Sequence, residues 1–256
     1  LKATNSVPLG MAMRYGATSI ESQVLELSRL PNIDEILLVP LYPHYAESTI
    51  ATTIAETERV LKKHALSIKL KTLKPFYDRP EYIEALVSSA QPWISEPENY
   101  DHVLFSYHGL PEQHITGTDP TGSHCLKQEN CCSVSSSAHE TCYRHQVFKT
   151  TECFVKETGL KQEQYTIAFQ SRLGRARWLE PSTNDTLIEL ANAGVKNLLV
   201  LCPAFVSDCL ETLEEIELEG TETFKSHGGE SLTLIPCLND NPVWVDKLTD
   251  LIASSA

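Results

Sequence analysis

The sequence predicts an α/β protein with parallel sheets, because short apolar strands alternate with helices and several polar motifs follow directly after strands. We expect strands at residues 36–40, 66–73, 103–106, 165–169, 198–201 and 232–235. We expect helices at 18–30, 49–64, from 80 onwards, and at 143–158, 183–193, 208–219 and 242–253. Such alternation is typical of doubly wound sheets covered by helices on both faces, in which ligands bind at the carboxyl ends of the strands.

Local signals define the ends of these elements. Thr18 to Glu21 has the form of a capping box that opens a helix. Pro80 and Pro242 suit the first position of their helices, because proline lacks the N–H that a helix leaves unpaired there. Residues 110–140 are too long and too polar for an ordinary connection, so this region needs a functional explanation.

Composition limits the function. The chain has 256 residues, 41% hydrophobic content and a formal net charge of -13, which excludes nucleic acid as the main partner and suits a protein that attracts cations. No apolar run approaches the roughly 18 residues that span a bilayer, so we expect a cytoplasmic protein with at most peripheral membrane contact. The chain opens with Leu1 and not with Met, so we expect an N-terminal part to be missing.

The most unusual stretch is an acidic helix that follows the strand at 198–201. Six acids lie between Asp208 and Glu219, and no Lys or Arg occurs between Lys196 and Lys225. Asp208 and Glu211 could form a helix-capping pair on a solvated face. That interpretation leaves Glu215 and Glu219 unexplained, since they continue the stripe of Glu211 at i+4 and i+8 and repel one another. The alternative is a path for cations or protons.

Three other polar groups follow predicted strands. His108 comes directly after a strand and before Gly109, where it could transfer protons near neutral pH or simply be hydrogen-bonded at a turn. Tyr42 to Thr49 supplies aromatic and hydroxyl groups. Gln170 to Trp178 could line a planar ligand or merely cap the next helix.

Five motifs in this order resemble ferrochelatase, and they span nearly the whole chain. They are Met13-Arg14-Tyr15-Gly16, Tyr42-Pro43-His44-Tyr45, Ser106-Tyr107-His108-Gly109-Leu110-Pro111, Phe169-Gln170-Ser171-Arg172-x-Gly174 with Trp178-Leu179-x-Pro181, and Ser207-Asp208-Cys209-Leu210-Glu211-Thr212-Leu213. The resemblance implies insertion of Fe(II) into protoporphyrin IX with loss of two protons, which completes haem.

The resemblance also implies the architecture. The porphyrin would lie in a cleft between two Rossmann-like halves, residues 1–90 and 91–238, the second with a Cys-rich insertion at 117–142. A C-terminal helix within 239–256 would pack back on the first half. The family's opening strand and its apolar lip would precede Leu1, so the expected cleft is incomplete.

By position in the motifs, His108 and Glu211 correspond to the family's catalytic pair, with His108 as proton acceptor or metal-side ligand. Glu215 and Glu219 would extend a metal or proton path outwards from them. The residues implied to bind substrate are Arg14, Tyr15, Tyr42, Ser48, Thr49, Arg79, Gln170, Ser171 and Trp178. Cys209 stands where many ferrochelatases have histidine, and a thiol there suits packing better than ligation.

Four of the eight cysteines crowd into the irregular region, at Cys125, Cys131, Cys132 and Cys142. Four thiolates suffice for zinc or for an iron–sulfur cluster, although the spacing lacks the Cys-x2-Cys pairs typical of structural zinc. Some bacterial ferrochelatases carry a [2Fe-2S] cluster on an internal four-Cys insertion, and the resemblance therefore favours a cluster. Mixed ligation with His124, His139 and His145 stays open.

Two alternatives remain beside a protoporphyrin ferrochelatase. One is a chelatase for another metal or tetrapyrrole, since neither preference follows from the residues. The other is a non-catalytic tetrapyrrole or metal carrier with an iron–sulfur sensor. A base opposite a carboxylate, His108 with Glu211, is the feature that a carrier would not need.

Overall fold

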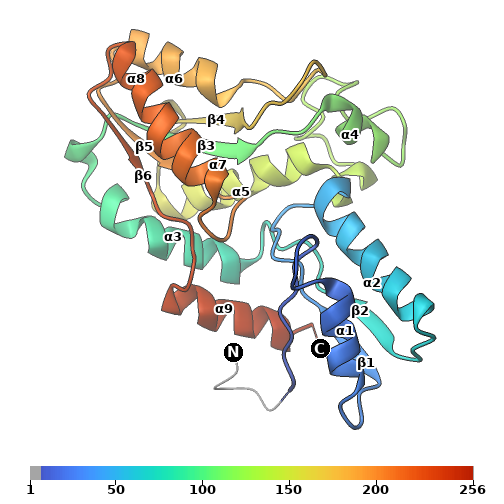
Figure 1. Cartoon of the computed structure of the whole chain (residues 1–256). Coiled ribbons are helices and arrows are strands. Elements are labelled where there is room, and N and C mark those ends of the chain that lie inside the picture. Colours follow the sequence, from blue (N-terminus) through green and yellow to red (C-terminus); the bar gives the residue numbers. More distant parts are fainter. Residues whose placement is uncertain (1–6, 256) are drawn as a thin grey trace.

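Two fully parallel sheets organise residues 7–255, which are the residues that the computed structural model describes (Figure 1). The smaller sheet pairs β1 (Glu35–Leu38) with β2 (Lys69–Thr72). The larger has the order β4-β3-β5-β6, made by β3 (His102–His108), β4 (Tyr165–Gln170), β5 (Asn197–Leu201) and β6 (Ser231–Leu234). The predicted α/β class is confirmed. The predicted first half includes residues 1–6 and the predicted C-terminal segment includes residue 256, and these residues lie outside the described part.

The helices follow the predicted order. They are α1 (Ile20–Ser28), α2 (Thr52–Lys63), α3 (Pro80–Ile94), α4 (Glu112–Gly117), α5 (Tyr143–Thr158), α6 (Thr183–Asn192), α7 (Leu210–Thr212), α8 (Thr221–Ser226) and α9 (Pro242–Ala253). α7 and α8 are joined by a π-helical segment, Leu213–Gly220, so the acidic helix runs further than predicted. α4 lies inside the region expected to be irregular, whereas residues 118–136 contain neither helix nor strand.

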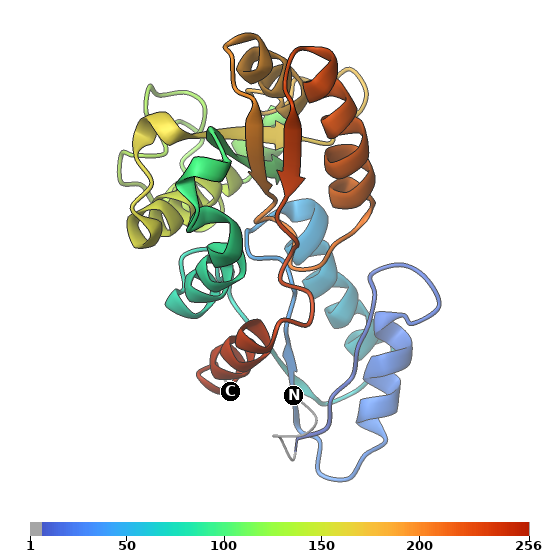
Figure 2. The ribbon, with the colours of Figure 1, turned by 90° about the vertical axis from the view of Figure 1, so that its left-hand side faces the viewer.

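Helices cover both faces of the larger sheet (Figure 2). Because side chains alternate along a strand, Phe105 and Tyr107 of β3 join the core formed with α3 and α5, whereas Leu104 joins the core formed with α6 and α8. All three side chains are fully buried. Burying each such side chain stabilises the fold by about 1.5–3 kcal/mol, so the two cores hold the strand ends in place.

The chain order creates a switch point between β3 and β5. The connection from β3 to β4 uses α5 on one face, whereas the connections that follow β4 and β5 use α6 and α8 on the other. Neighbouring strands whose connections leave towards opposite faces open a crevice at their carboxyl ends. Here those carboxyl ends are His108, the last residue of β3, and Leu201, the last residue of β5.

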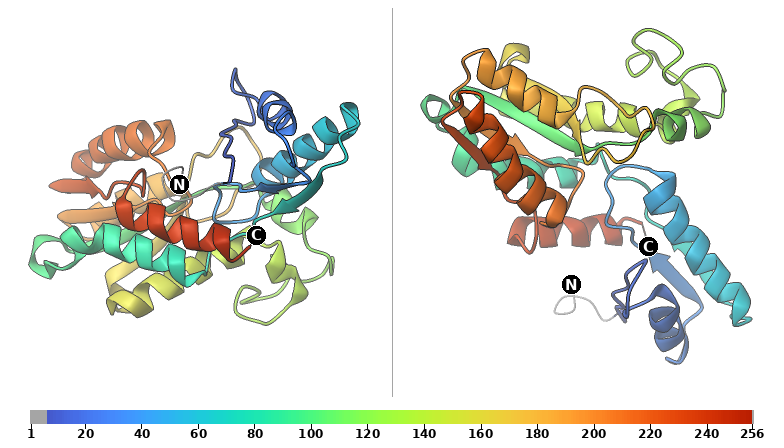
Figure 3. Two further views of the ribbon diagram at one scale, coloured as in Figure 1. Left: turned by 90° about the horizontal axis from the view of Figure 1, so that it is seen from below. Right: turned by 45° about the horizontal axis from the view of Figure 1, so that its top comes forward.

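The smaller sheet packs with α1 and α2 through Ile20, Val24, Val60 and Leu61. The C-terminal helix α9 packs on α3 (Figure 3). The ring of Trp244 contacts those of Phe76 and Tyr82. An ion pair between Lys247 and Glu84 joins the same two helices.

One predicted cap is wrong. The first helix is capped by Ser19, whose hydroxyl accepts the backbone N–H of Ser22, and not by a box running from Thr18 to Glu21. The carboxylate of Glu21 instead binds Lys63 at 2.7 Å and His64 at 2.6 Å, both at the end of α2. The capping pattern is local, and these two partners, 42 and 43 residues away, outcompete it.

Candidate functional site

His108 ends β3 at the switch point, and its side chain is half-buried. Its Nδ1 lies 2.6 Å from the backbone carbonyl oxygen of Gly109. A carbonyl can only accept, so Nδ1 carries the proton and the neutral ring keeps a lone pair on Nε2. The ring of Phe205, from the loop after β5, packs against it at 6.1 Å between centroids. His108 can therefore accept a proton or bind a metal through Nε2.

Gln170 lies opposite His108 in the pairing of β3 with β4 and is buried. Its Oε1 accepts a hydrogen bond of 2.7 Å from the hydroxyl of Ser106. Its Nε2 donates to the backbone carbonyl oxygen of Glu211 at 2.5 Å. This one side chain thus joins the ends of β3 and β4 to the first turn of the acidic helix.

Glu215 lies beside Gln170 and is held by the next residue of the chain, Ser171. Its carboxylate accepts one hydrogen bond from the backbone N–H of Ser171 and one from the Ser171 hydroxyl, both of 2.6 Å. Glu211 and Glu215 are half-buried, whereas Glu219 is exposed. Exposure therefore increases along the acidic helix towards Glu219, and Glu215 and Glu219 lie on a π-helical segment of the kind that is frequent at functional sites.

Asp208 and Glu211 do not form the capping pair that is one of the two interpretations of the acidic helix. The carboxylate of Asp208 accepts the backbone N–H of Cys237 at 3.0 Å and the amide of Asn239 at 2.6 Å, so it secures the loop after β6. Cys209 is the residue at the N-cap. Burial raises the pKa of the Cys209 thiol, and a hydrogen bond with the Glu211 carboxylate adds to this, so the thiol stays protonated beside that carboxylate.

The residues predicted to bind substrate from the first half make local contacts of their own. The guanidinium of Arg14 lies over the ring of Tyr15 at 4.7 Å, and that ring is 75% exposed. Arg79 is exposed and pairs with Glu81 at 3.0 Å. Within residues 7–255 no hydrogen bond or ion pair joins Arg14, Tyr15 or Arg79 to His108.

Tyr42, Ser48 and Thr49 belong to the connection between β1 and α2. Tyr42 and Ser48 are exposed, and Thr49 is half-buried in a π-turn, Glu47–Ala51, that precedes α2. Exposed aromatic and hydroxyl groups on this connection are accessible to a ligand.

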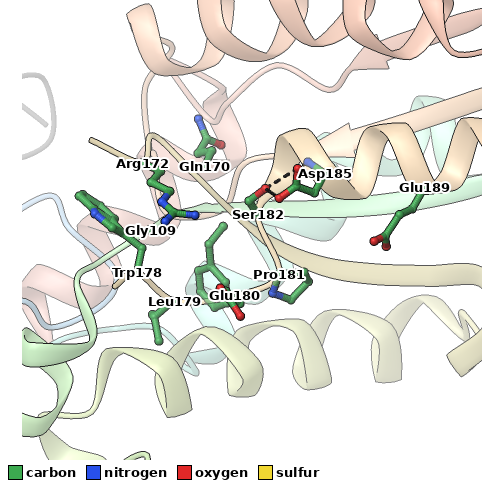
Figure 4. A pocket seen from close by; sticks show the side chains of 11 residues that line it. Gly109, Gln170, Arg172, Trp178, Leu179, Glu180, Pro181, Ser182, Asp185 and Glu189 are labelled. Atoms are coloured by element: carbon green, nitrogen blue, oxygen red, sulfur yellow. Dashed lines mark hydrogen bonds between the residues drawn. The ribbon is translucent and has the colours of Figure 1, made fainter. Parts of the chain in front are cut away.

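A cavity of about 480 Å³ borders the strand ends. It shares Gly109 and Gln170 with the group described above and is also lined by Trp178, whose Nε1 donates to the carbonyl of Leu173 at 3.1 Å. Arg172 and Trp178 lie at one end of the cavity and Asp185 and Glu189 at the other (Figure 4). Gln170 and Trp178 are thus brought together with the end of β3, whereas the side chain of His108 does not line the cavity.

The four cysteines of residues 118–142, here termed the Cys loop, are all buried and none forms a disulfide. Hydrogen bonding with Cys132 lowers the pKa of the Cys142 thiol against the cost of its burial. The guanidinium of Arg144 lies 3.4 Å from Sγ of Cys132 and 3.9 Å from Sγ of Cys131. In the described part of the chain, no three His, Cys, Asp or Glu side chains are arranged around a single metal ion.

Three imidazoles support the Cys131–Cys132 turn through its carbonyls. Nε2 of His124 and of His139 lies 2.6 and 2.9 Å from the Cys131 oxygen, and Nδ1 of His145 lies 2.7 Å from the Cys132 oxygen. Each of these nitrogens therefore carries a proton and donates it, which leaves only the other ring nitrogen free for ligation.

A doubly wound sheet with a histidine, a buried amide and two carboxylates at its switch point defines an α/β protein with an enzyme-like site. The ferrochelatase family model matches residues 1–256. The chain is 51% identical over 245 residues to the ferrochelatases of Pseudomonas fluorescens and Stutzerimonas stutzeri, covering 95% of this chain and 71% of each relative. The chain belongs to the ferrochelatase family.

Solved structures support the fold. SirB from Bacillus subtilis with Fe3+ superposes with a TM-score of 0.66 at 16% identity, covering all of this chain and 85% of SirB. The cobalt complex of the sirohydrochlorin chelatase SirB gives a TM-score of 0.64. At this identity the likeness concerns the fold alone. No helix among the described residues is long and apolar enough to cross a membrane.

Two neighbours of the site were missed by the sequence analysis. The hydroxyl of Tyr143 donates to the backbone carbonyl of His108 at 2.7 Å, and Phe205 packs on the His108 ring. Tyr143 follows Cys142 directly, which is a signal for the Cys loop but not for a contact with a strand end 35 residues earlier. The fold alone brings these residues together.

Proposed function

We propose that this chain inserts ferrous iron into protoporphyrin IX and releases two protons, forming haem. The observation that carries the proposal is the grouping of His108, Gln170, Glu211 and Glu215 at the switch point. Ferrochelatases about half identical to the chain over almost its whole length support the choice of reaction. Fe(II) is here a substrate and not a resident cofactor.

The chemistry requires a base beside the ring, because the two pyrrole N–H groups occupy the space that iron must enter. In this proposal Nε2 of His108 accepts a pyrrole proton, since Nδ1 is already committed to the Gly109 carbonyl. Glu211 is the facing carboxylate, and its oxygens suit ferrous iron. Glu215 and Glu219 continue to solvent and would carry iron inwards or protons outwards.

Porphyrin binding would use both proposed halves, residues 1–90 and 91–238. The C-terminal segment, predicted as residues 239–256, contributes α9, which packs on α3. Bidentate pairing with a propionate suits the guanidinium groups of Arg14 and Arg79. The remaining proposed substrate contacts are Tyr15, Tyr42, Ser48, Thr49, Gln170, Ser171 and Trp178. Trp178 offers an indole face to a planar ring.

Anaerobic Fe(II) insertion into protoporphyrin IX, followed by loss of porphyrin fluorescence, tests the reaction. Wild-type protein should turn over, and His108→Ala should be slower by about 10²–10⁴-fold, the usual contribution of a positioned base. His227→Ala is the control, because that histidine is exposed near the end of α8. Equal rates for wild type and His108→Ala would overturn the role of His108, and no turnover at all would overturn the reaction.

We also propose that Cys125, Cys131, Cys132 and Cys142 hold a [2Fe-2S] cluster. Such a cluster takes two thiolates on each iron, so it needs no three ligands around one ion, whereas a structural zinc site needs four. The four buried thiols and the adjacent guanidinium of Arg144 fit an anionic group of this kind. When bound, the cluster supplies one-electron redox chemistry and takes no part in the insertion step.

Absorption spectra and elemental analysis test the cluster. The purified protein should be coloured, contain about two irons per chain and give an electron paramagnetic resonance signal on one-electron reduction. Cys125→Ser should remove these signals. Cys153→Ser should keep them, because that thiol lies on α5 outside the Cys loop. One zinc per chain in a colourless wild-type protein would overturn the assignment.

We place the reaction in the cytoplasm. All eight cysteines are free thiols, which suits a reducing compartment. Cell fractionation with an antibody to the chain tests this placement, and recovery from a membrane fraction after a salt wash would contradict it.

A further inference from the structure

The first turn of α5 lies between the Cys loop and the candidate active site. Cys142 is the residue at the N-cap of α5, and Tyr143 is its first helical residue. The ring of Tyr143 is buried, and its hydroxyl donates to the backbone carbonyl of His108 at 2.7 Å. The last residue of the Cys loop is therefore next in the chain to a residue that contacts the end of β3.

A second contact leaves the same turn from Gln146, whose side chain is fully buried. Its Nε2 donates to the carbonyls of His139 and Glu140 in the Cys loop, at 3.2 and 2.9 Å. Its Oε1 accepts the backbone N–H of Tyr45 at 2.7 Å. Tyr45 belongs to the connection that also carries Tyr42, Ser48 and Thr49.

We infer that Tyr143 and Gln146 are positioning residues that couple the four cysteines to the porphyrin site, through His108 and through residues 42–49 respectively. This inference rests on the proposed function. Two further residues of the same turn contact Cys132: Arg144 lies 3.4 Å from its Sγ and Nδ1 of His145 lies 2.7 Å from its carbonyl oxygen, so a change in what the thiols bind is felt at the helix N-terminus.

The physical reason for the coupling is burial. A buried hydrogen bond is costly to leave unpaired, so a shift of the first turn carries its partners with it and does not simply break the contacts. Coupling of this kind is reciprocal: if cysteine ligation strengthens porphyrin binding, porphyrin must stabilise the Cys loop by the same factor. Typical coupling factors lie between about 5-fold and 150-fold.

A double-mutant cycle on the full chain tests the inference. Cys142→Ser removes one thiol but keeps a residue that caps a helix well. Tyr143→Phe removes only the hydroxyl and keeps the buried ring. The readout is the Kd for protoporphyrin IX without iron, from quenching of tryptophan fluorescence, so it does not depend on turnover.

We expect Cys142→Ser to weaken porphyrin binding at least 5-fold in the wild-type background and by a smaller factor in the Tyr143→Phe background, where only the contacts of Gln146 remain. Gln146→Met tests the second contact independently, because it removes the hydrogen bonds that join the Cys loop to Tyr45. Two variants serve as controls. Tyr100→Phe removes a remote hydroxyl contact and should leave the effect of Cys142→Ser unchanged. Cys153→Ser, on the same helix as Tyr143, should not weaken porphyrin binding by itself.

Hydrogen exchange measures the reciprocal effect. Protoporphyrin IX should slow amide exchange in residues 118–142 of the wild type and do so less in Tyr143→Phe. If Cys142→Ser has no effect on the Kd, or the same effect in both backgrounds, the coupling is overturned while the proposed function stands. If the wild type does not bind protoporphyrin IX, the proposed function falls, and the coupling with it.

Discussion

Ser171 holds the carboxylate of Glu215 with two hydrogen bonds of 2.6 Å, one from its backbone N–H and one from its hydroxyl. Ser171 adopts a left-handed backbone with φ of 65°, directly after β4. Gln170, one residue earlier, donates to the carbonyl of Glu211. The end of β4 thus contacts two successive turns of the acidic helix, at Glu211 in α7 and at Glu215 in the π-helical segment.

Removing the hydroxyl of Ser171 should weaken the binding of the Glu215 carboxylate to the end of β4. Hydrogen bonds to charged groups contribute about 1.5–3 kcal/mol, so Ser171→Ala should lower kcat for iron insertion by roughly tenfold or more if that loss is felt in the transition state. Steady-state kinetics with varied Fe(II) measures it. Glu217→Gln, an exposed acid on the same helix, is the control. A Ser171→Ala variant as active as the control would contradict the prediction.

Gly109 packs too closely for a side chain. An added Cβ would lie 2.9 Å from the carbonyl oxygen of Gln170 and 3.2 Å from Cε3 of Trp178. Gly109→Ala should therefore destabilise the protein by about 1–3 kcal/mol, as overpacking usually does, and lower activity by displacing His108. The urea midpoint at constant m-value measures the change in stability.

Gly117 provides the matched control, because an added Cβ there meets nothing within 4 Å and the residue ends α4. Gly117→Ala should leave the urea midpoint unchanged or raise it by an amount worth up to about 1 kcal/mol. Equal losses in the two alanine variants would show that the close contact at Gly109 is not the cause.

Local patterns explain most of what the sequence could predict. The apolar run from Val103 to Phe105 marks β3, and α5 ends at Gly159, whose φ of 74° suits a residue without a Cβ. His108 was identifiable because it directly follows a buried strand, and strand ends meet at one edge of a parallel sheet.

Distant partners explain what the sequence could not predict. Asp208 looks like a helix cap, yet its partners Cys237 and Asn239 lie 29 and 31 residues further along the chain. The hydrogen bonds of Gln170 with Glu211 and of Ser171 with Glu215 likewise join residues more than 40 positions apart. No periodicity in the acidic helix records these contacts.

His44 should make stability depend on pH. It is buried, and burial lowers its pKa from the ordinary value of 6.5 to about 3. Below pH 6.5 His44 therefore binds a proton in the unfolded chain but not in the folded protein. The free energy of unfolding falls as pH drops from 6.5 towards 3. At pH 5.5 the loss is roughly 1.4 kcal/mol relative to pH 8.

His44→Gln should remove this part of the pH dependence, because an amide does not titrate and can still donate to the hydroxyl of Thr150, which lies 2.8 Å from Nε2. Urea unfolding of both proteins at pH 5.5 and pH 8 measures the difference. Wild type should lose about 1.4 kcal/mol more than the variant on acidification. Parallel losses would mean that His44 is protonated in the folded state.

Arg144 should raise the reduction potential of the proposed cluster. Its guanidinium donates towards the sulfurs of Cys132 and Cys131, and it is held over the ring of Phe148 at 4.7 Å. Among residues 7–255 no carboxylate pairs with it within 4.0 Å, so the cysteine sulfurs are the partners of its charged group there. A cation beside a cluster favours the reduced, more negative state.

Arg144→Met keeps the apolar contact with Phe148 and removes the charge. If the guanidinium favours the reduced state by about 1 kcal/mol, the midpoint potential should fall by about 40 mV for one electron. A redox titration followed by electron paramagnetic resonance measures it. Arg144→Lys retains the charge without the planar donors and should lie between the two. An unchanged potential in Arg144→Met would mean that the guanidinium does not act on the cluster, because no other part of that substitution alters the charge beside the sulfurs.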